Sequence, residues 1–256
     1  MEQTPQGIRI NKYLSEMGFC SRRAADQLIE DRRVTINGQV PEMGTRVMPG
    51  DLVKVNGKEI TASHEKPVYI ALHKPIGIVC TTDTRREKNN IIDFIKYPKR
   101  IFPIGRLDKP SEGLILLTSD GDIVNKILRA HNAHEKEYVV SVDKPITKDF
   151  LRKMSSGVEI LDTVTRPCKV FRHDQYTFTI VLTQGLNRQI RRMCEALGYH
   201  VSRLKRVRIM NITLDTPVGQ WRHLTEKELS DIKHMVEHSS KTSPYAKDAA
   251  DEESYD

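Results

Sequence analysis

Two Asn-Gly pairs within the first 60 residues constrain the fold of this chain more than any other feature. Asn37-Gly38 lies in VTINGQV and Asn56-Gly57 lies in LVKVNGKEI, and both pairs are flanked by β-branched residues. An Asn-Gly pair between strand-forming residues is typical of a two-residue hairpin turn, because such turns need residues that tolerate a positive φ. We therefore expect short antiparallel strands in this part of the chain.

Two short helices are predicted before these hairpins. IRINKYLSEMG is expected to form a helix that ends at Gly18, and Ser21 is expected to cap a second helix, SRRAADQLIEDRR. Ala24, Ala25, Leu28 and Ile29 have the spacing that buries one face of this second helix. Residues 8–60 are thus predicted to form a small domain, and the polar stretch 61–67 a linker.

From residue 68 onward, strand and helix patterns alternate without a regular βαβ rhythm. The predicted strands are VYIAL, GIVCTT, GLILLT, KEYVVSV, TFTIVLT and VSRLKRVRIMNITL. The predicted helices are NNIIDFI, DGDIVNKILRA, TKDFLRKMSSG, RQIRRMCEALG and TEKELSDIKHMVEH. This pattern predicts an α+β domain over residues 68–238, with a mixed, mainly antiparallel sheet flanked by helices.

The charge distribution favours a polyanionic partner. The net charge is +7, and the last 18 residues carry two Lys against five acidic residues, which leaves +10 on the rest of the chain. An ordered body this basic is typical of proteins that bind nucleic acid. The segment 239–256 has few apolar residues and is predicted to be a disordered acidic tail.

Several other classes of function are disfavoured. The four cysteines, at positions 20, 80, 168 and 194, form no CxxC pair, and the nine histidines are not accompanied by other ligands at metal-binding spacing. We therefore expect no metal site. No apolar run approaches the ~20 residues that span a bilayer, and the N-terminus lacks the apolar core of a signal peptide. A soluble, cytoplasmic protein is predicted.

Two groups of basic residues are candidates for RNA contacts. Arg22 and Arg23 lie in the first turn of the second helix, where the alternative is a solvated helix face. The second group contains Arg188, Arg191 and Arg192 on one predicted helix, at positions i, i+3 and i+4, followed by Arg203, Lys205, Arg206 and Arg208. Like charges on one face repel one another, so we expect RNA phosphates to neutralise them.

The loop GRLDKPSEG holds a candidate catalytic carboxylate. Asp108 can act as a nucleophile or general base if a guanidinium holds it in place, and Arg106 or an Arg of the RQIRR helix can supply that group. The alternative is a charged surface turn.

Four motifs together resemble those of the pseudouridine synthases. GRLDKPSEGLILLTSDG resembles the central motif with the essential Asp, and KEYVV, GLNRQIRRM and RLKRVRI resemble the later motifs in the same order. INKYLSEMGFCSRRAADQLIEDRRVTINGQ is similar to the S4 RNA-binding module. An S4 module followed by these motifs is found in the branch of the family that modifies bacterial ribosomal RNA. The resemblance extends from residue 8 to about residue 237.

The resemblance implies a role for each matching residue. Asp108 is expected to be the catalytic centre at the target uridine and to pair with Arg191. Tyr138 is expected to stack on the uracil, Leu204 to pack on the base's other side, and Arg106 to occupy the space that the flipped uridine leaves. The remaining predicted substrate contacts are Arg188, Arg192, Arg206, Arg22 and Arg23. Glu112 is expected to stay outside the chemistry.

The implied activity is the isomerisation of one uridine in a 23S ribosomal RNA stem-loop to pseudouridine, with base flipping and without a cofactor. A transfer RNA is left open as a second substrate, and a monomer is expected. One alternative is a sugar or nucleoside hydrolase that uses Asp108 and Glu112 as paired carboxylates. Another is a non-catalytic RNA-binding or ribosome-assembly protein.

Overall fold

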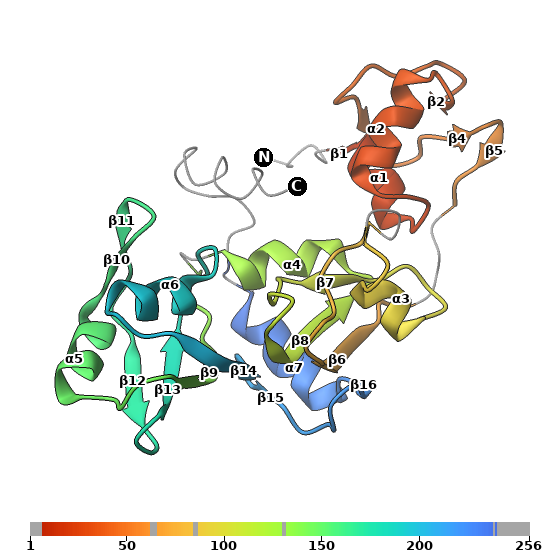
Figure 1. Cartoon of the computed structure of the whole chain (residues 1–256). Helices are drawn as coiled ribbons and strands as arrows, with labels where there is room; N and C mark the ends of the chain where they lie inside the picture. Colours follow the sequence, from red (N-terminus) through yellow and green to blue (C-terminus); the bar gives the residue numbers. More distant parts are fainter. Residues whose placement is uncertain (1–6, 62–65, 84–86, 130–131, 238, 240–256) are drawn as a thin grey trace. The chain divides into compact units, whose positions relative to one another are not determined.

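The computed structural model describes residues 7–61, 66–83, 87–129, 132–237 and 239 (Figure 1). The chain divides into two compact units, one largely before Val68 and one from Val68 onward. Most of the predicted linker, and all of the predicted acidic tail except Ser239, lie outside the described residues.

The first unit contains two helices and short antiparallel strands, as the sequence predicts. In chain order its elements are β1 (Ile8–Arg9), α1 (Ile10–Glu16), α2 (Arg22–Glu30), β2 (Val34–Ile36), β3 (Arg46–Val47), β4 (Val53–Val55) and β5 (Lys58–Glu59). Strand β1 pairs with β3, and β2, β4 and β5 form a second sheet in that order. Its core consists of buried residues from both helices and these strands: Ile10, Leu14, Ala25, Ile29, Val34, Val47, Val53 and Val55.

The predicted turns and caps of the first unit are confirmed. Gly18, just after α1, has a φ of 73°, and the Ser21 side chain accepts a hydrogen bond of 3.0 Å from the Ala24 amide at the start of α2. Both Asn-Gly pairs have positive φ at each residue: 51° and 83° in the first, 52° and 77° in the second. The second pair joins β4 to β5.

The second unit contains the large sheet and five helices in the part of the chain that the structure describes. Its elements are β6 (Tyr69–Lys74), α3 (Ile91–Ile95), β7 (Phe102–Ile104), β8 (Glu112–Thr118), α4 (Gly121–Leu128), β9 (Lys136–Val142), α5 (Lys148–Ser156), β10 (Glu159–Ile160), β11 (Thr163–Val164), β12 (Lys169–Arg172), β13 (Thr177–Leu182), α6 (Gln189–Ala196), β14 (Val201–Ile209), β15 (Ile212–Thr213), β16 (Trp221–His223) and α7 (Glu226–Met235).

The sheet is mixed and mainly antiparallel, so the predicted α+β fold is confirmed. Its strand order is β12-β13-β9-β14-β8-β6-β16, with β15 beside β14 and β7 beside β8. Among the described strands, β14 and β8 form the parallel pair, and the other pairs are antiparallel. Strands far apart in sequence, β8, β9 and β14, thus meet at the centre of the sheet.

Helices cover both faces of this sheet. Alternate residues of β6 and β8 enter two separate cores, with Leu72 and Ile115 on one face and Ala71 and Leu116 on the other. The first core receives side chains from α3, α5 and α6, and the second receives side chains from α4 and α7. Burial on both faces explains why β8 is almost entirely apolar.

One predicted strand does not form. The stretch GIVCTT, residues 77–82, has a single isolated bridge, between Val79 and Asn90. Its backbone pairs with the loop before α3 instead. The Val79 amide donates to the Asn89 carbonyl, and the Val79 carbonyl accepts from the Ile91 amide. The apolar run was too short to reveal that its partner is a loop and not a strand.

Candidate active site

The Asp108 side chain projects from the loop between β7 and β8, which is fixed from several directions. The Ser111 amide donates to the Asp108 carbonyl at 3.0 Å, and the Gly77 amide donates to the Lys109 carbonyl at 2.8 Å. Leu107 is buried, and its amide donates to the Cys80 sulfur at 3.4 Å. The loop therefore has little freedom, while the Asp108 side chain keeps 35% of its surface exposed.

Arg191, on helix α6, lies next to this carboxylate. Its Nε is 3.8 Å from Asp108 Oδ2, and its side chain is 11% exposed. Its Nη2 donates to Ser111 Oγ at 3.1 Å, and its Nη1 donates to the Val201 carbonyl at 3.3 Å. The Nε is buried and has no hydrogen-bond partner among the described residues. Burial lowers the pKa of Arg191, and the charge of Asp108 opposes this effect.

Tyr138, Leu204 and Arg206 lie on neighbouring central strands and face the same side of the sheet. Tyr138 of β9 stands opposite Arg206 of β14, and Leu204 stands opposite Val140. All three side chains are buried, with exposed fractions of 9% or less. The Arg206 guanidinium carbon is 5.9 Å from the centre of the Tyr138 ring, a cation–π distance. These three side chains, one aromatic, one apolar and one cationic, lie together on this side of the sheet, and we call them the apolar floor of the site.

Arg206 also connects this floor to the Asp108 loop. Its Nε donates to the Leu114 carbonyl at 2.7 Å, and its Nη1 lies 3.5 Å from the Arg106 carbonyl. Its Nη2 is buried without a hydrogen-bond partner among the described residues. A buried donor without an acceptor is costly, which is typical of a site that a ligand completes.

Gly113 allows the close parallel contact between β8 and β14. It pairs with Arg206 in register and has a φ of 118°. A Cβ at this position would stand 2.3 Å from the Arg206 carbonyl oxygen and 2.5 Å from the Arg206 amide nitrogen. Gly113, the second glycine of GRLDKPSEG, is therefore required because a Cβ does not fit against the Arg206 backbone.

The other predicted RNA contacts lie on the surface or beside a helix end. Arg106 is exposed in the Asp108 loop, and Arg22 and Arg23 are exposed on the first turn of α2 in the first unit. Arg192 donates to the Asn187 carbonyl at 3.1 Å and to its side-chain oxygen at 3.2 Å.

Arg188 lies just before the helix that carries Arg191 and Arg192, not within it. It has left-handed backbone angles, with φ 48° and ψ 32°, and its carbonyl accepts from the Arg192 amide at 3.0 Å. Its side chain remains exposed next to the start of α6.

The basic residues along β14 are mostly paired within the protein. Arg203 donates to Glu112 at 2.8 Å, and Lys205 lies 3.7 Å from the same carboxylate. Arg208 lies 3.0 Å from Glu135 and 2.8 Å from Glu137. These three cations therefore have carboxylate partners within the protein. Glu112 is committed to its basic neighbours, which disfavours the hydrolase with paired carboxylates.

Sequence reasoning missed three buried polar residues near the site. Ser111 is buried beside Arg191, and Lys74 is buried and donates to the Pro75 and Ile78 carbonyls at 2.8 Å each. Lys136 is 7% exposed, and no described residue pairs with its ammonium group. Burial and, to a lesser extent, Arg206 lower the pKa of Lys136 to about 8. The alternating pattern of KEYVV could have predicted the burial of Lys136, because it places Lys136 on the same buried face as Tyr138.

Replacing Lys136 by Met is expected to stabilise the free protein at pH 7. The pKa of Lys136 falls from 10.5 to about 8 on folding, so the unfolded chain binds more protons between these values. The cost of the buried charge is complete below pH 8 and disappears as the pH rises toward 10.5. Urea unfolding should show a gain of about 1–3 kcal/mol at pH 7 and almost none near pH 10.

The exposed Lys153, 51% exposed on α5, is the matched control for this measurement. Its replacement by Met should change the free energy of unfolding by about 0.5 kcal/mol or less at either pH. A loss of stability in Lys136→Met at pH 7 would show that the ammonium group is stabilised in the free protein.

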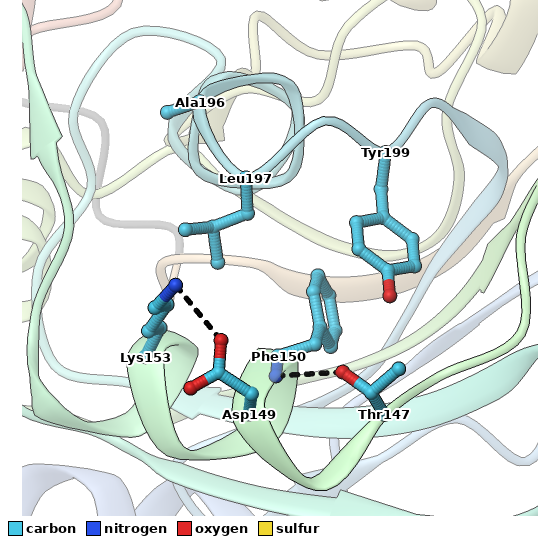
Figure 2. A pocket seen from close by; sticks show the side chains of 7 residues that line it. All are labelled: Thr147, Asp149, Phe150, Lys153, Ala196, Leu197 and Tyr199. Atoms are coloured by element: carbon cyan, nitrogen blue, oxygen red, sulfur yellow. Dashed lines mark hydrogen bonds and ion pairs between the residues drawn. The ribbon is translucent and has the colours of Figure 1, made fainter.

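A separate cavity lies away from these residues. Its volume is about 320 Å³, and it lies between the start of α5 and the end of α6 (Figure 2). Figure 2 shows the ion pair of Lys153 with Asp149 and the Phe150–Thr147 hydrogen bond on its α5 side. Its lining residues are Thr147, Asp149, Phe150, Lys153, Ala196, Leu197 and Tyr199. It contains none of the predicted site residues.

Neither a membrane-spanning helix nor a metal-binding cluster is present among the described residues. None of the helices there is long and apolar enough to cross a membrane. The same residues contain no cluster of three or more His, Cys, Asp and Glu side chains arranged to hold a metal ion.

Asp108 thus lies beside the Arg191 guanidinium, in a loop that Arg206 connects to the buried residues of the central strands. The chain belongs to the RNA pseudouridylate synthase family, which residues 68–196 match, and residues 8–53 match the S4 domain. The protein is therefore an RNA pseudouridine synthase, an isomerase, with an S4 domain before its catalytic domain.

Individual relatives support this assignment. The chain is 57% identical over 235 residues to the dual-specificity RNA pseudouridine synthase RluF of Escherichia coli (strain K12), covering 91% of this chain and 81% of that protein. It is 36% identical to the ribosomal large subunit pseudouridine synthase B of Bacillus subtilis (strain 168), covering 90% and 97%. A solved pseudouridylate synthase aligns with a TM-score of 0.66 at 28% identity, over 88% of this chain and 99% of that one.

Proposed function

We propose that this protein converts one uridine in a stem-loop of 23S ribosomal RNA to pseudouridine, with Asp108 as its one essential carboxylate and without a cofactor. Asp108 lies beside Arg191, and its loop is in contact with Arg206, which faces Tyr138 on the central strands; this arrangement carries the proposal. The name of the ribosomal large subunit pseudouridine synthase B of Bacillus subtilis supports ribosomal RNA as the substrate class.

The reaction is an internal rearrangement, so its atoms balance without a co-reactant. The bond between N1 of uracil and C1′ of the ribose breaks, the uracil turns, and C5 bonds to C1′. The proton on C5 is lost, and N1 gains a proton. Asp108 acts at the target uridine, and Arg191 orients the carboxylate and offers its unpaired Nε as a donor.

The apolar floor would hold the detached uracil while it turns. Tyr138 stacks on one side of the base with its hydroxyl available for the C5 proton, and Leu204 packs on the other side. Arg206 has one buried donor free for a base or ribose oxygen. Burial of these side chains limits the access of water, which would otherwise intercept the separated uracil and ribose.

The target uridine must leave its stack to reach Asp108, at a cost of a few kcal/mol. Arg106, exposed in the same loop, would fill the space that the base leaves. Arg188, Arg192, Arg22 and Arg23 would contact phosphates and repay part of the cost. We further propose that the enzyme works as a cytoplasmic monomer, and that a transfer RNA is a second substrate, in keeping with the dual specificity in the name of RluF.

Replacing Ser111 by Ala is expected to lower kcat about tenfold. Ser111 Oγ accepts from Arg191 Nη2 at 3.1 Å, and its loss leaves the guanidinium less well oriented toward Asp108. Ser111→Thr keeps the hydroxyl and should restore most of kcat. Single-turnover rates of the three proteins test this, and an equal loss in the Thr variant would assign Ser111 to packing alone.

The substrate assignment is tested by mapping. Unmodified large-subunit ribosomal RNA and transfer RNA are each incubated with the protein, and pseudouridines are located by chemical modification and primer extension. We expect a single modified position in the 23S RNA. Modification of the transfer RNA alone would overturn the ribosomal assignment, and modification of neither RNA would favour a non-catalytic RNA-binding protein.

A further inference from the structure

An exposed cluster of aromatic rings lies at the edge of the large sheet, away from the residues discussed above. Trp221, the only Trp of the chain, is on the edge strand β16 and is 38% exposed. Its ring centre is 5.7 Å from that of Tyr97 and 5.5 Å from that of His223, and Tyr97 and His223 are 6.0 Å apart. All three contacts are edge-to-face. We call these three residues the aromatic platform.

Further exposed apolar side chains adjoin the platform. Phe94 of α3 is 38% exposed, and Val218, in the turn before β16, is 55% exposed. A Cβ on Gly219 would stand 3.5 Å from the Phe94 ring, so α3 and this turn are in contact. Isolated exposed apolar residues are ordinary, but a contiguous group of this kind marks an interaction site.

The charges around the platform favour a polyanion over a protein surface. Lys96, Lys99 and Arg100 flank Tyr97 in sequence and are exposed, and Arg100 also lies over the Phe102 ring at 5.7 Å. Against these three cations stands the exposed Asp93 of α3. The acidic Asp215, near β16, is bound by Arg222 at 2.7 Å. Aromatic rings bordered by cations are the combination with which proteins bind unpaired nucleotides, because bases stack on the rings while phosphates meet the cations.

The platform faces the same side of the sheet as the proposed active site. Trp221 stands opposite Leu72 of β6, Leu72 stands opposite Ile115 of β8, and Ile115 belongs to the same core as Tyr138. From β9 to β16 there are four strand spacings (Figure 1), or about 19 Å. A stacked strand that rises about 3.4 Å per nucleotide covers this distance in about six nucleotides.

We propose that the aromatic platform is a second RNA-binding site, which stacks an unpaired nucleotide about six positions from the target uridine. Stacking on Trp221 and Tyr97 would anchor the strand at the sheet edge while the target lies at Asp108. The proposal depends on the proposed function for the identity of its ligand, an RNA strand with unpaired bases.

Trp221 itself provides the first test, because the tryptophan emission of this protein comes from this residue alone. The full-length protein is titrated with hexauridylate and, separately, with a fully paired RNA duplex of six base pairs. We expect hexauridylate to quench the tryptophan emission saturably. The duplex should quench it little, because its bases are already stacked on one another. Unchanged emission at saturating hexauridylate would overturn the proposal. Emission that changes with protein concentration alone would also overturn it, in favour of a contact between copies.

Substitutions provide the second test. Trp221→Leu and Tyr97→Leu should each weaken binding of the substrate RNA about 5- to 100-fold and raise KM with kcat nearly unchanged. Trp221→Phe keeps a ring and should recover part of the affinity. Phe171→Leu is the matched control, since Phe171 is 56% exposed on β12 at the other edge of the sheet. Equal effects at Phe171 and Trp221 would overturn the proposal.

The two tests separate this site from the proposed function. Quenching and weaker binding in a protein that isomerises no uridine would refute the proposed function and leave the platform in place. Normal isomerisation with the same KM in wild type and Trp221→Leu would refute the platform alone.

Discussion

Replacing Asp108 by Asn is expected to lower the rate of pseudouridine formation about 10³- to 10⁴-fold, with the affinity for RNA nearly unchanged. The amide keeps the shape of the carboxylate but removes its charge and its capacity as nucleophile or base. The fixed loop and the Ser111–Arg191 contact do not depend on the Asp108 side chain, so the fold should persist. Pseudouridine in digested RNA is measured by nucleoside chromatography, and affinity by filter binding.

Glu112→Gln is the matched comparison for this variant. Glu112 follows Asp108 by four residues but is buried against Arg203 and Lys205, outside the proposed chemistry. Activity per folded molecule should stay within about threefold of wild type, since the variant loses ion pairs and no reacting group. Equal losses in both variants would support the hydrolase-like pair of carboxylates instead.

Replacing Gly113 by Ala is expected to destabilise the catalytic domain by at least about 3 kcal/mol. The added Cβ would overlap backbone atoms of Arg206, which have no freedom to move because β8 and β14 are paired there. The φ of 118° adds strain for any residue with a Cβ. Thermal unfolding should show the midpoint of the larger unit lowered by ~6 °C or more.

Gly185→Ala is the control for this effect. A Cβ on Gly185 would meet nothing within 4 Å, and no positive φ restricts that position. Its replacement should change the free energy of unfolding by about 0.5 kcal/mol or less. Wild-type stability in Gly113→Ala would contradict the close contact between β8 and β14 on which the placement of Arg206 depends.

Local sequence patterns predicted most of the fold. The caps, the Asn-Gly turns and most strands and helices depend on neighbouring residues, so propensity and periodicity are sufficient to locate them. The prediction of a strand at GIVCTT was wrong because its backbone partner, the loop before α3, cannot be inferred from the residues of GIVCTT itself. The left-handed backbone conformation of Arg188 could not be predicted either, since an Arg carries no local signal for a positive φ.

The site was predicted less completely than the fold, because it is assembled from distant segments. The family motifs pointed to Asp108 and Arg191, which the fold brings to 3.8 Å although they are 83 positions apart. Ser111 became part of the site only through its hydrogen bond to Arg191, which lies 80 positions away in the sequence. The pairing of Arg203, Lys205 and Arg208 with carboxylates also depends on strand register, which charge counting along the chain does not capture.

The most direct test of the proposed function is the release of tritium from C5. Ribosomal RNA labelled at uracil C5 is incubated with the wild-type protein in EDTA, without added cofactor, and with Asp108→Asn. The prediction is that wild type releases one tritium per RNA molecule and that the variant, at equal RNA occupancy, releases almost none. Absence of release by the wild-type protein bound to the RNA, or equal release by Asp108→Asn, would contradict it.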